Sequence, residues 1–365
     1  MFNAVFQAMR PVQSACHAGD CQRNERAVNS ARSQVNESIQ GLRGAAALTV
    51  MIVHVHFMAA KGGLTTLIDA PWIDHVGPYA VMLFFCISGY LIISTLSKHG
   101  DVGRFARNRV IRLYPVFGLL HLVMFSLGPF MNYEWMGELR GRPLDWAGHF
   151  VSNLLFLPGL FDLPIAQKNA WSLSYEAAFY VIAAVLFAGS RRWSSGMGKV
   201  WVLLGLVAAS CVIAAEIKVV FFAVGSLVWL LERHQRLHIP FASLLGLLGC
   251  GAGFVLYYQG HILFSAVCAF PFFAGLALQK GWAAMALRSR FLVFLGQVSY
   301  SLYLIHPFVL DPLRRVCVKM MGSLPLGTLH LIFVLVGASL VTLAAWLSYE
   351  FIEVRLTQWL FRRKQ

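Results

Sequence analysis

Stretches of about twenty apolar residues recur along almost the whole chain, the first being GLRGAAALTVMIVHVHFMAA at residues 41–60. A helix of this length can cross the hydrocarbon core of a bilayer. Only 13% of the 365 residues are charged, against roughly 25% in a typical soluble domain. The sequence therefore predicts an all-α fold, a polytopic membrane helix bundle.

The distribution of Lys and Arg predicts which side of the membrane each loop faces, because cytoplasmic loops carry the excess of positive charge. The loop 97–113 holds five such residues and is placed inside, whereas 61–78 and 131–147 are placed outside. Spans placed on this basis give about ten crossings with both termini in the cytoplasm. One stretch disagrees, because Arg314, Arg315 and Lys319 fall on the predicted outside.

Three regions are expected along the chain. Residues 1–40 are polar and of mixed charge, and we expect a disordered cytoplasmic tail. Residues 41–355 form the membrane domain, and 356–365 form a basic cytoplasmic tail. The apolar piece 148–160 is too short to cross the bilayer and is expected to be re-entrant or interfacial.

Two classes of function are not predicted. The formal net charge of +14 arises mostly from short loops, so it reflects membrane orientation and does not indicate nucleic-acid binding. Cys16, His17 and Cys21 resemble half of a metal site, but no second pair follows them. The histidines in the spans also lack ligand-like spacing, so no metal site is expected.

The first span contains a charged residue and a histidine on one helix face. Arg43 and His54 are eleven residues apart, which is about three helical turns and about 16 Å. An imidazole inside a membrane is costly unless it is paired or used. This arrangement suggests a route from a charged ligand at the inner edge to a reaction centre near mid-depth.

A carboxylate lies within the span predicted near 172–189. Ser172, Glu176 and Tyr180 follow each other at intervals of four residues and share one helix face. Counting from the helix end places Glu176 in the outer third of the membrane. Ionisable residues inside membranes are mostly functional, so a functional role is favoured over a structural hydrogen bond.

Two further polar groups leave alternatives open. Tyr303 and His306 share a face with Ser299 in the span near 291–310, where they could line a site or join neighbouring helices. The pair Ser88–Gly89 favours close helix packing, although a hydroxyl near His54 could also bind a substrate or act as a nucleophile.

Arg109 and Arg112 lie near the cytoplasmic edge in RFARNRVIRLYP. The positive-inside rule alone would account for them. Two arginines about one turn apart, on the same side as Arg43, could also form a fork for phosphate oxygens. Such a phosphate-bearing ligand would be cytoplasmic.

Five sequence blocks, in order, resemble the acyltransferase-3 family of integral-membrane acyltransferases of the polysaccharide O-acetyltransferase type. They are LRGAAALTVMIVH, which matches the family's signature of Arg, ten residues and His, then FFCISGYLI, RNRVIRLYP, WSLSYEAAFY and GQVSYSLYLIHP. The resemblance covers residues 41–355. It implies a bundle of about ten spans that moves an acyl group, expected to be acetyl, from cytoplasmic acyl-CoA to a sugar hydroxyl.

The resemblance also implies roles for particular residues. His54 is the expected catalytic residue, assisted by Glu176, and the acyl-CoA phosphates are expected at Arg43, Arg109 and Arg112. Groups expected to line the site or contact the acceptor are Ser88, Ser172, Tyr180, Tyr303 and His306. Acyl-CoA serves as co-substrate with no bound cofactor, the acceptor is a surface or exported glycan or lipid-linked sugar, and the location is a bacterial inner membrane.

Two other functions use the same residues. Intramembrane His and Glu residues also form proton relays, so a proton-coupled transporter of a glycan intermediate or a small anion is the principal alternative. No internal repeat is visible, which lowers its weight. A non-catalytic scaffold in an export complex would leave the buried ionisable residues without a role.

Overall fold

The computed structural model describes residues 36–65, 71–131 and 133–362. These residues are 82% helical and form no strand, which confirms the all-α prediction. Most of the predicted tail at residues 1–40 lies outside the described residues, and so does the end of the basic tail.

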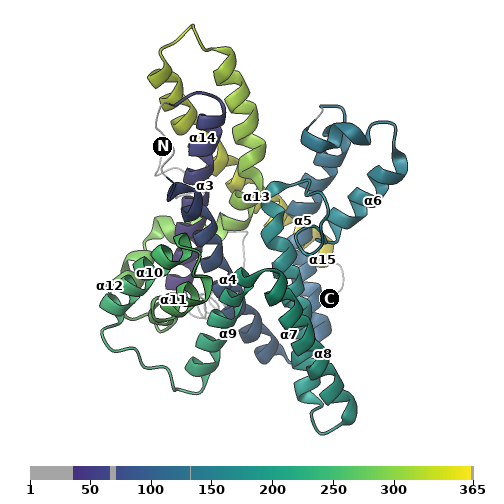
Figure 1. The fold of residues 1–365 in the computed structure, drawn as a ribbon, viewed down its shortest axis with the longest axis vertical. Helices are drawn as coiled ribbons and strands as arrows, with labels where there is room; N and C mark the ends of the chain where they lie inside the picture. The colour runs from purple at the N-terminus through teal and green to yellow at the C-terminus, as the bar shows by residue number, and fades with distance from the viewer. Residues whose placement is uncertain (1–35, 66–70, 132, 363–365) are drawn as a thin grey trace, which may run out of the picture. The chain divides into compact units, whose positions relative to one another are not determined.

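The elements follow one another in a simple order (Figure 1). The first half comprises α3 (Glu37–Lys61), α4 (Ile73–His99), α5 (Val102–Leu127), η1 (Glu134–Leu139), α6 (Pro143–Leu154), η2 (Lys168–Ala170), α7 (Trp171–Arg191) and α8 (Gly196–Ala215). The second half comprises η3 (Ile217–Val219), α9 (Val220–Arg233), α10 (Ala242–Tyr258), α11 (Ile262–Ala277), α12 (Gly281–Leu287), α13 (Arg290–Lys319), α14 (Leu326–Ser348), the π-helix η4 (Tyr349–Leu356) and α15 (Thr357–Arg362).

Seven of the described helices are long and apolar enough to cross a membrane, and α11 with α12 forms an eighth if this pair, bent by 67°, is one span. The chain is therefore a multi-pass membrane protein. The predicted count of about ten is higher because it includes α9 and α10. These helices have 14 and 17 residues, whereas about 20 are needed to cross the hydrocarbon core.

Helix α3 lies directly against α13, and glycines make this contact possible. A Cβ atom on Gly44 would lie 2.0 Å from the Leu292 carbonyl oxygen, and one on Gly296 would lie 2.0 Å from the Gln40 carbonyl oxygen. Near the other end of α3, Gly62 meets the side chain of Arg314. The contacts follow the same order along both helices, so α3 and α13 run parallel (Figure 1).

A second glycine contact joins α4 to α9. A Cβ atom on Gly89 would lie 2.1 Å from the Phe222 carbonyl oxygen, and one on Gly225 would lie 1.8 Å from the Cys86 carbonyl oxygen. Small residues allow membrane helices to approach this closely. Gly89 therefore serves packing, as one interpretation of Ser88–Gly89 predicts, and its neighbour Ser88 faces elsewhere.

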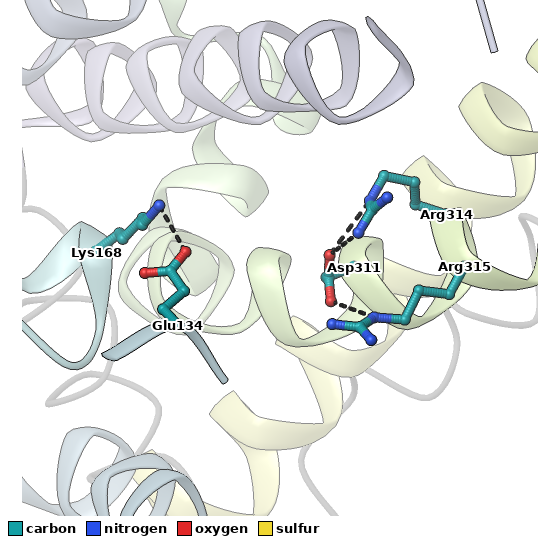
Figure 2. A network of polar contacts seen from close by, with 5 residues as sticks. All are labelled: Glu134, Lys168, Asp311, Arg314 and Arg315. Atoms are coloured by element: carbon teal, nitrogen blue, oxygen red, sulfur yellow. Dashed lines mark hydrogen bonds and ion pairs between the residues drawn. The ribbon is translucent and has the colours of Figure 1, made fainter. Parts of the chain in front are cut away.

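The positive stretch that disagreed with the loop rule belongs to a helix. Arg314 and Arg315 lie in α13 and both bind Asp311, with N–O distances of 2.6 Å and 2.9 Å (Figure 2). One carboxylate thus offsets part of their charge. Because the orientation rule concerns loops flanking the spans, these arginines are poor indicators of orientation.

We expect the α3–α13 contact to be sensitive to a single methyl group. Gly296→Ala places a Cβ atom against the backbone of α3 and should lower the melting temperature of the detergent-purified protein, because overpacking costs about 1–3 kcal/mol. Gly118→Ala in α5 is the matched control, because a Cβ there meets no atom within 4 Å. Equal melting temperatures for the two variants would contradict the close approach.

Candidate active site

One cavity brings together seven of the ten predicted site residues. It has about 700 Å³ of empty space between α3, α4, α5, α7 and α13. The predicted residues that line it are Arg43, Ser88, Arg109, Arg112, Ser172, Glu176 and Tyr303. We call this space the arginine cavity. Residues from five separate segments converge here, which neither loop rules nor helix periodicity alone would require.

Glu176 holds two hydroxyl groups at one carboxylate oxygen. Ser88 Oγ donates to Glu176 Oε1 at 3.0 Å, and the Tyr180 hydroxyl donates to the same atom. Tyr180 is buried and does not line the arginine cavity, so it holds the carboxylate from the side that faces away from the cavity. Ser88 and Tyr180 are thus tied to the site by a shared partner.

The expected depth of Glu176 needs correction. Glu176 lines the same cavity as the arginines and interacts electrostatically with Arg43, so an outer-third position separate from the arginines is wrong. The reason lies just before α7. Asn169 Nδ2 donates to the Tyr303 carbonyl oxygen at 2.7 Å, so α7 begins inside the bundle and not at its edge.

The arginines of this cavity have further partners. Arg109 lies over the rings of Phe105 and Tyr180, at 5.5 Å and 5.7 Å from the ring centroids. Its Nε atom is buried and has no hydrogen-bond partner among the described residues. A cation held by aromatic faces retains donors for another ligand.

Glu353 is a site residue that the sequence analysis missed. It lies in the π-helix η4 and accepts a hydrogen bond from Ser301 Oγ at 2.6 Å. It interacts electrostatically with Arg43 and Arg112. A carboxylate close to the end of the last apolar stretch is one available signal, and π-helices themselves occur often at functional sites.

His54 and His306 form a pair of facing imidazoles. Their ring centroids are 4.6 Å apart, at an interplanar angle of 66°. His54 Nδ1 lies 2.9 Å from the Val50 carbonyl oxygen, and His306 Nδ1 lies 3.1 Å from that of Leu302. A carbonyl can only accept, so each Nδ1 of a neutral ring carries the proton and each Nε2 presents a lone pair, which in His306 faces the Asn169 amide.

A polar wall separates the histidines from the arginine cavity. The Tyr303 hydroxyl bonds Ser172 Oγ at 2.8 Å and donates to the Asn169 carbonyl oxygen at 2.9 Å. Asn169 Nδ2 in turn lies 3.5 Å from His306 Nε2. The residues of the wall thus form a continuous chain of polar contacts from the arginine cavity to His306.

His54 opens into a second, smaller cavity on the other side of this wall. It has about 460 Å³ of empty space, and His54 lines it together with Gln167, Lys168 and Asn169. We call it the histidine cavity. The predicted approach of Glu176 to His54 is not among the contacts of the described residues, because Glu176 belongs to the arginine cavity.

One residue that lines the histidine cavity, Lys168, belongs to a charged pair. Lys168 Nζ lies 2.7 Å from Glu134 Oε1, and Asp311 with its two arginines lies in the same region (Figure 2). Within the described parts of the chain, no group of three His, Cys, Asp or Glu residues could hold a metal ion.

Curated proteins share parts of this sequence. The chain is 30% identical over 187 residues to "Peptidoglycan O-acetyltransferase OatA" of Listeria monocytogenes, covering 47% of the chain and 28% of that protein. It is 32% identical over 151 residues to "Acyltransferase MdmB" of Streptomyces mycarofaciens, covering 40% of the chain and 37% of that protein.

A relative from Staphylococcus aureus aligns more broadly, at 25% identity over 86% of the chain and 56% of its own length. The chain thus spans between about a quarter and just over half of these relatives. No solved structure matches the chain significantly. The acyltransferase domain that defines the acyltransferase-3 family matches residues 36–350, and this range includes every residue of both cavities. The chain is therefore a member of the acyltransferase-3 family.

Proposed function

We propose that this protein is a membrane O-acyltransferase that moves an acyl group, acetyl in the simplest case, from cytoplasmic acyl-CoA to a sugar hydroxyl of a surface or exported glycan. The observation that carries this proposal is the placement of the arginine cavity beside the histidine pair. The names of the relatives, which include a peptidoglycan O-acetyltransferase, support the same chemistry.

The arginine cavity suits the phosphates of coenzyme A. Guanidinium groups bind phosphate oxygens through paired, charge-assisted hydrogen bonds. Arg43, Arg109 and Arg112 line one space, and the positive-inside rule places that end of the bundle in the cytoplasm. Glu176 and Glu353 lie near these arginines and reduce their mutual repulsion when no phosphate is bound.

His54 is suited to act as the general base. Its Nδ1–H is held by the Val50 carbonyl, so Nε2 can take the proton of an acceptor hydroxyl. The hydroxyl oxygen then forms a bond to the thioester carbonyl carbon, and the carbon–sulfur bond breaks. The departing thiolate receives the proton from His54, so the products are an ester and free coenzyme A.

His306 acts as a positioning residue in this scheme. It is fully buried, and its ring faces His54 while its Nε2 faces Asn169. Direct transfer requires the thioester carbonyl and the acceptor hydroxyl to meet at the polar wall formed by Asn169, Ser172 and Tyr303.

Radiolabel transfer from acetyl-CoA into the glycan fraction tests the proposal. We expect membranes with wild-type protein to form a base-labile labelled product, and His54→Ala to lower its rate by about 10²–10⁴, the usual contribution of a general base. His56→Ala is the matched control, because His56 lines neither cavity.

Equal labelling by wild type and His54→Ala at matched protein levels would remove His54 from the chemistry. Uptake of a sugar or an anion by purified protein in vesicles, driven by a proton gradient and without consumption of acetyl-CoA, would favour transport over transfer.

Removal of an arginine from the arginine cavity should weaken the binding of the acyl donor, acetyl-CoA. We expect Arg112→Gln to raise the KM for acetyl-CoA by about tenfold or more, because a hydrogen bond between charged groups contributes about 1.5–3 kcal/mol. Arg104→Gln, an exposed position on the same helix that lies outside the cavity, should leave the KM unchanged. Equal KM values for all three proteins would exclude the phosphate role.

Ser88 and Glu176 should differ in their effects. Ser88→Ala removes one of two hydroxyl groups on the carboxylate, and we expect most of the transfer rate to remain. Glu176→Gln keeps the shape and removes the charge that balances the arginines, so the rate should fall by about tenfold or more. Complete loss of transfer in Ser88→Ala would instead indicate an acyl-serine intermediate.

A further inference from the structure

Gln167 is a buried amide without an internal partner. The residue is 5% exposed, yet neither Oε1 nor Nε2 has a hydrogen-bond partner among the described residues. Leaving such groups unpaired in a folded protein costs about 1–3 kcal/mol each. A buried polar group of this kind calls for an explanation, and its location supplies one, because Gln167 lines the histidine cavity beside His54.

The backbone around Gln167 is firmly held. Asn153 Oδ1 accepts a hydrogen bond from the Ala166 backbone N–H at 2.9 Å, and Asn153 Nδ2 donates to the Pro164 carbonyl oxygen at 3.0 Å. The Gln167 carbonyl accepts from the Ala170 N–H at 2.8 Å. The amide is thus positioned by its neighbours, while its own donor and acceptor remain available.

The rest of the histidine cavity fits an uncharged molecule. The cation of Lys168 is paired with Glu134, and the rings of Tyr133 and Phe308 supply apolar walls. A few convergent polar groups between aromatic walls favour a neutral polyhydroxyl compound over an anion.

The two cavities lie at opposite ends of one helical route. Arg43 lines the arginine cavity and His54 lines the histidine cavity, about 16 Å apart along α3. The residues of the histidine cavity outside the predicted spans, Tyr133, Gln167, Lys168 and Asn169, belong to a region that the charge rule places outside. A second substrate can therefore reach His54 without passing the arginines.

We propose that Gln167 binds the hydroxyl-bearing acceptor, a neutral sugar unit, in the histidine cavity, with one amide atom donating to and the other accepting from adjacent hydroxyl groups. This inference rests on the proposed function for its meaning, but the binding site itself can be tested without turnover. Gln167 is thus a specificity-determining residue, and His54 remains the base.

Saturation-transfer NMR with methyl β-glucoside and methyl N-acetyl-β-glucosaminide, added to purified protein in nanodiscs, tests this site. We expect wild type to transfer saturation to at least one of the two sugars and Gln167→Leu to reduce that signal about tenfold. Arg112→Gln, altered in the other cavity, should keep it. A signal retained in Gln167→Leu, or no signal from wild type with either sugar, would overturn the inference.

Stability distinguishes this role from a structural one. Gln167→Leu removes no internal hydrogen bond of the described residues, so its melting temperature should equal or exceed that of wild type. Asn153→Leu removes three hydrogen bonds and should melt several degrees lower. A large loss of stability in Gln167→Leu would indicate a packing role.

The transfer assay separates this inference from the proposed function. If both are correct, Gln167→Leu should lower label transfer to the glycan fraction while leaving the KM for acetyl-CoA unchanged. Transfer by wild type that is insensitive to Gln167→Leu would overturn only the role of Gln167. Sugar binding that depends on Gln167, without any transfer by wild type, would overturn only the proposed function.

Discussion

The close parallel contact between α3 and α13 is the constraint on which the site depends. Backbone against backbone at Gly44 and Gly296 fixes the distance and the register of the two helices. About three turns further along, the same register brings His54 and His306 face to face. Bulkier residues at the glycines would push the helices apart, and the two imidazole rings would no longer be in contact. The absence of side chains at these two glycines therefore determines the geometry of the proposed reacting centre, far along the helix axis.

Opposite charges make the arginine cavity tolerable within an apolar bundle. Three guanidinium groups in one space repel each other, and burial strengthens that repulsion because the surroundings screen charge poorly. Glu176 and Glu353 supply negative charge from α7 and η4, and aromatic rings cover one face of Arg109. The cavity can thus persist without the proposed phosphate ligand and still retain donors for one.

Much of this site could be predicted from sequence because lipid gives polar side chains few alternatives. Arg43, Glu176 and Tyr303 lie in apolar spans, so they must face the interior of the bundle, where they meet. Gln167 and Asn169 could not be found this way, because they lie in a polar connection in which such residues are ordinary. The separation of Glu176 from His54 was equally hidden, since periodicity within one helix says nothing about its neighbours. The short helices α9 and α10 were counted as full spans for a related reason: apolar composition alone does not show whether a helix is long enough to cross the membrane.

The polar wall of Asn169, Ser172 and Tyr303 has a consequence for the membrane as an electrical insulator. A protein that binds one substrate from each face of a bilayer, as proposed for this one, must not let ions pass between the two sites. Here the two cavities end against each other at residues that are hydrogen-bonded to one another through side chains and backbone carbonyl groups. Under the proposed function, only an acyl group has to cross this barrier, and no open passage for hydrated ions is required. If the proposed function is correct, molecules beyond the membrane are modified without discharging the potential across it.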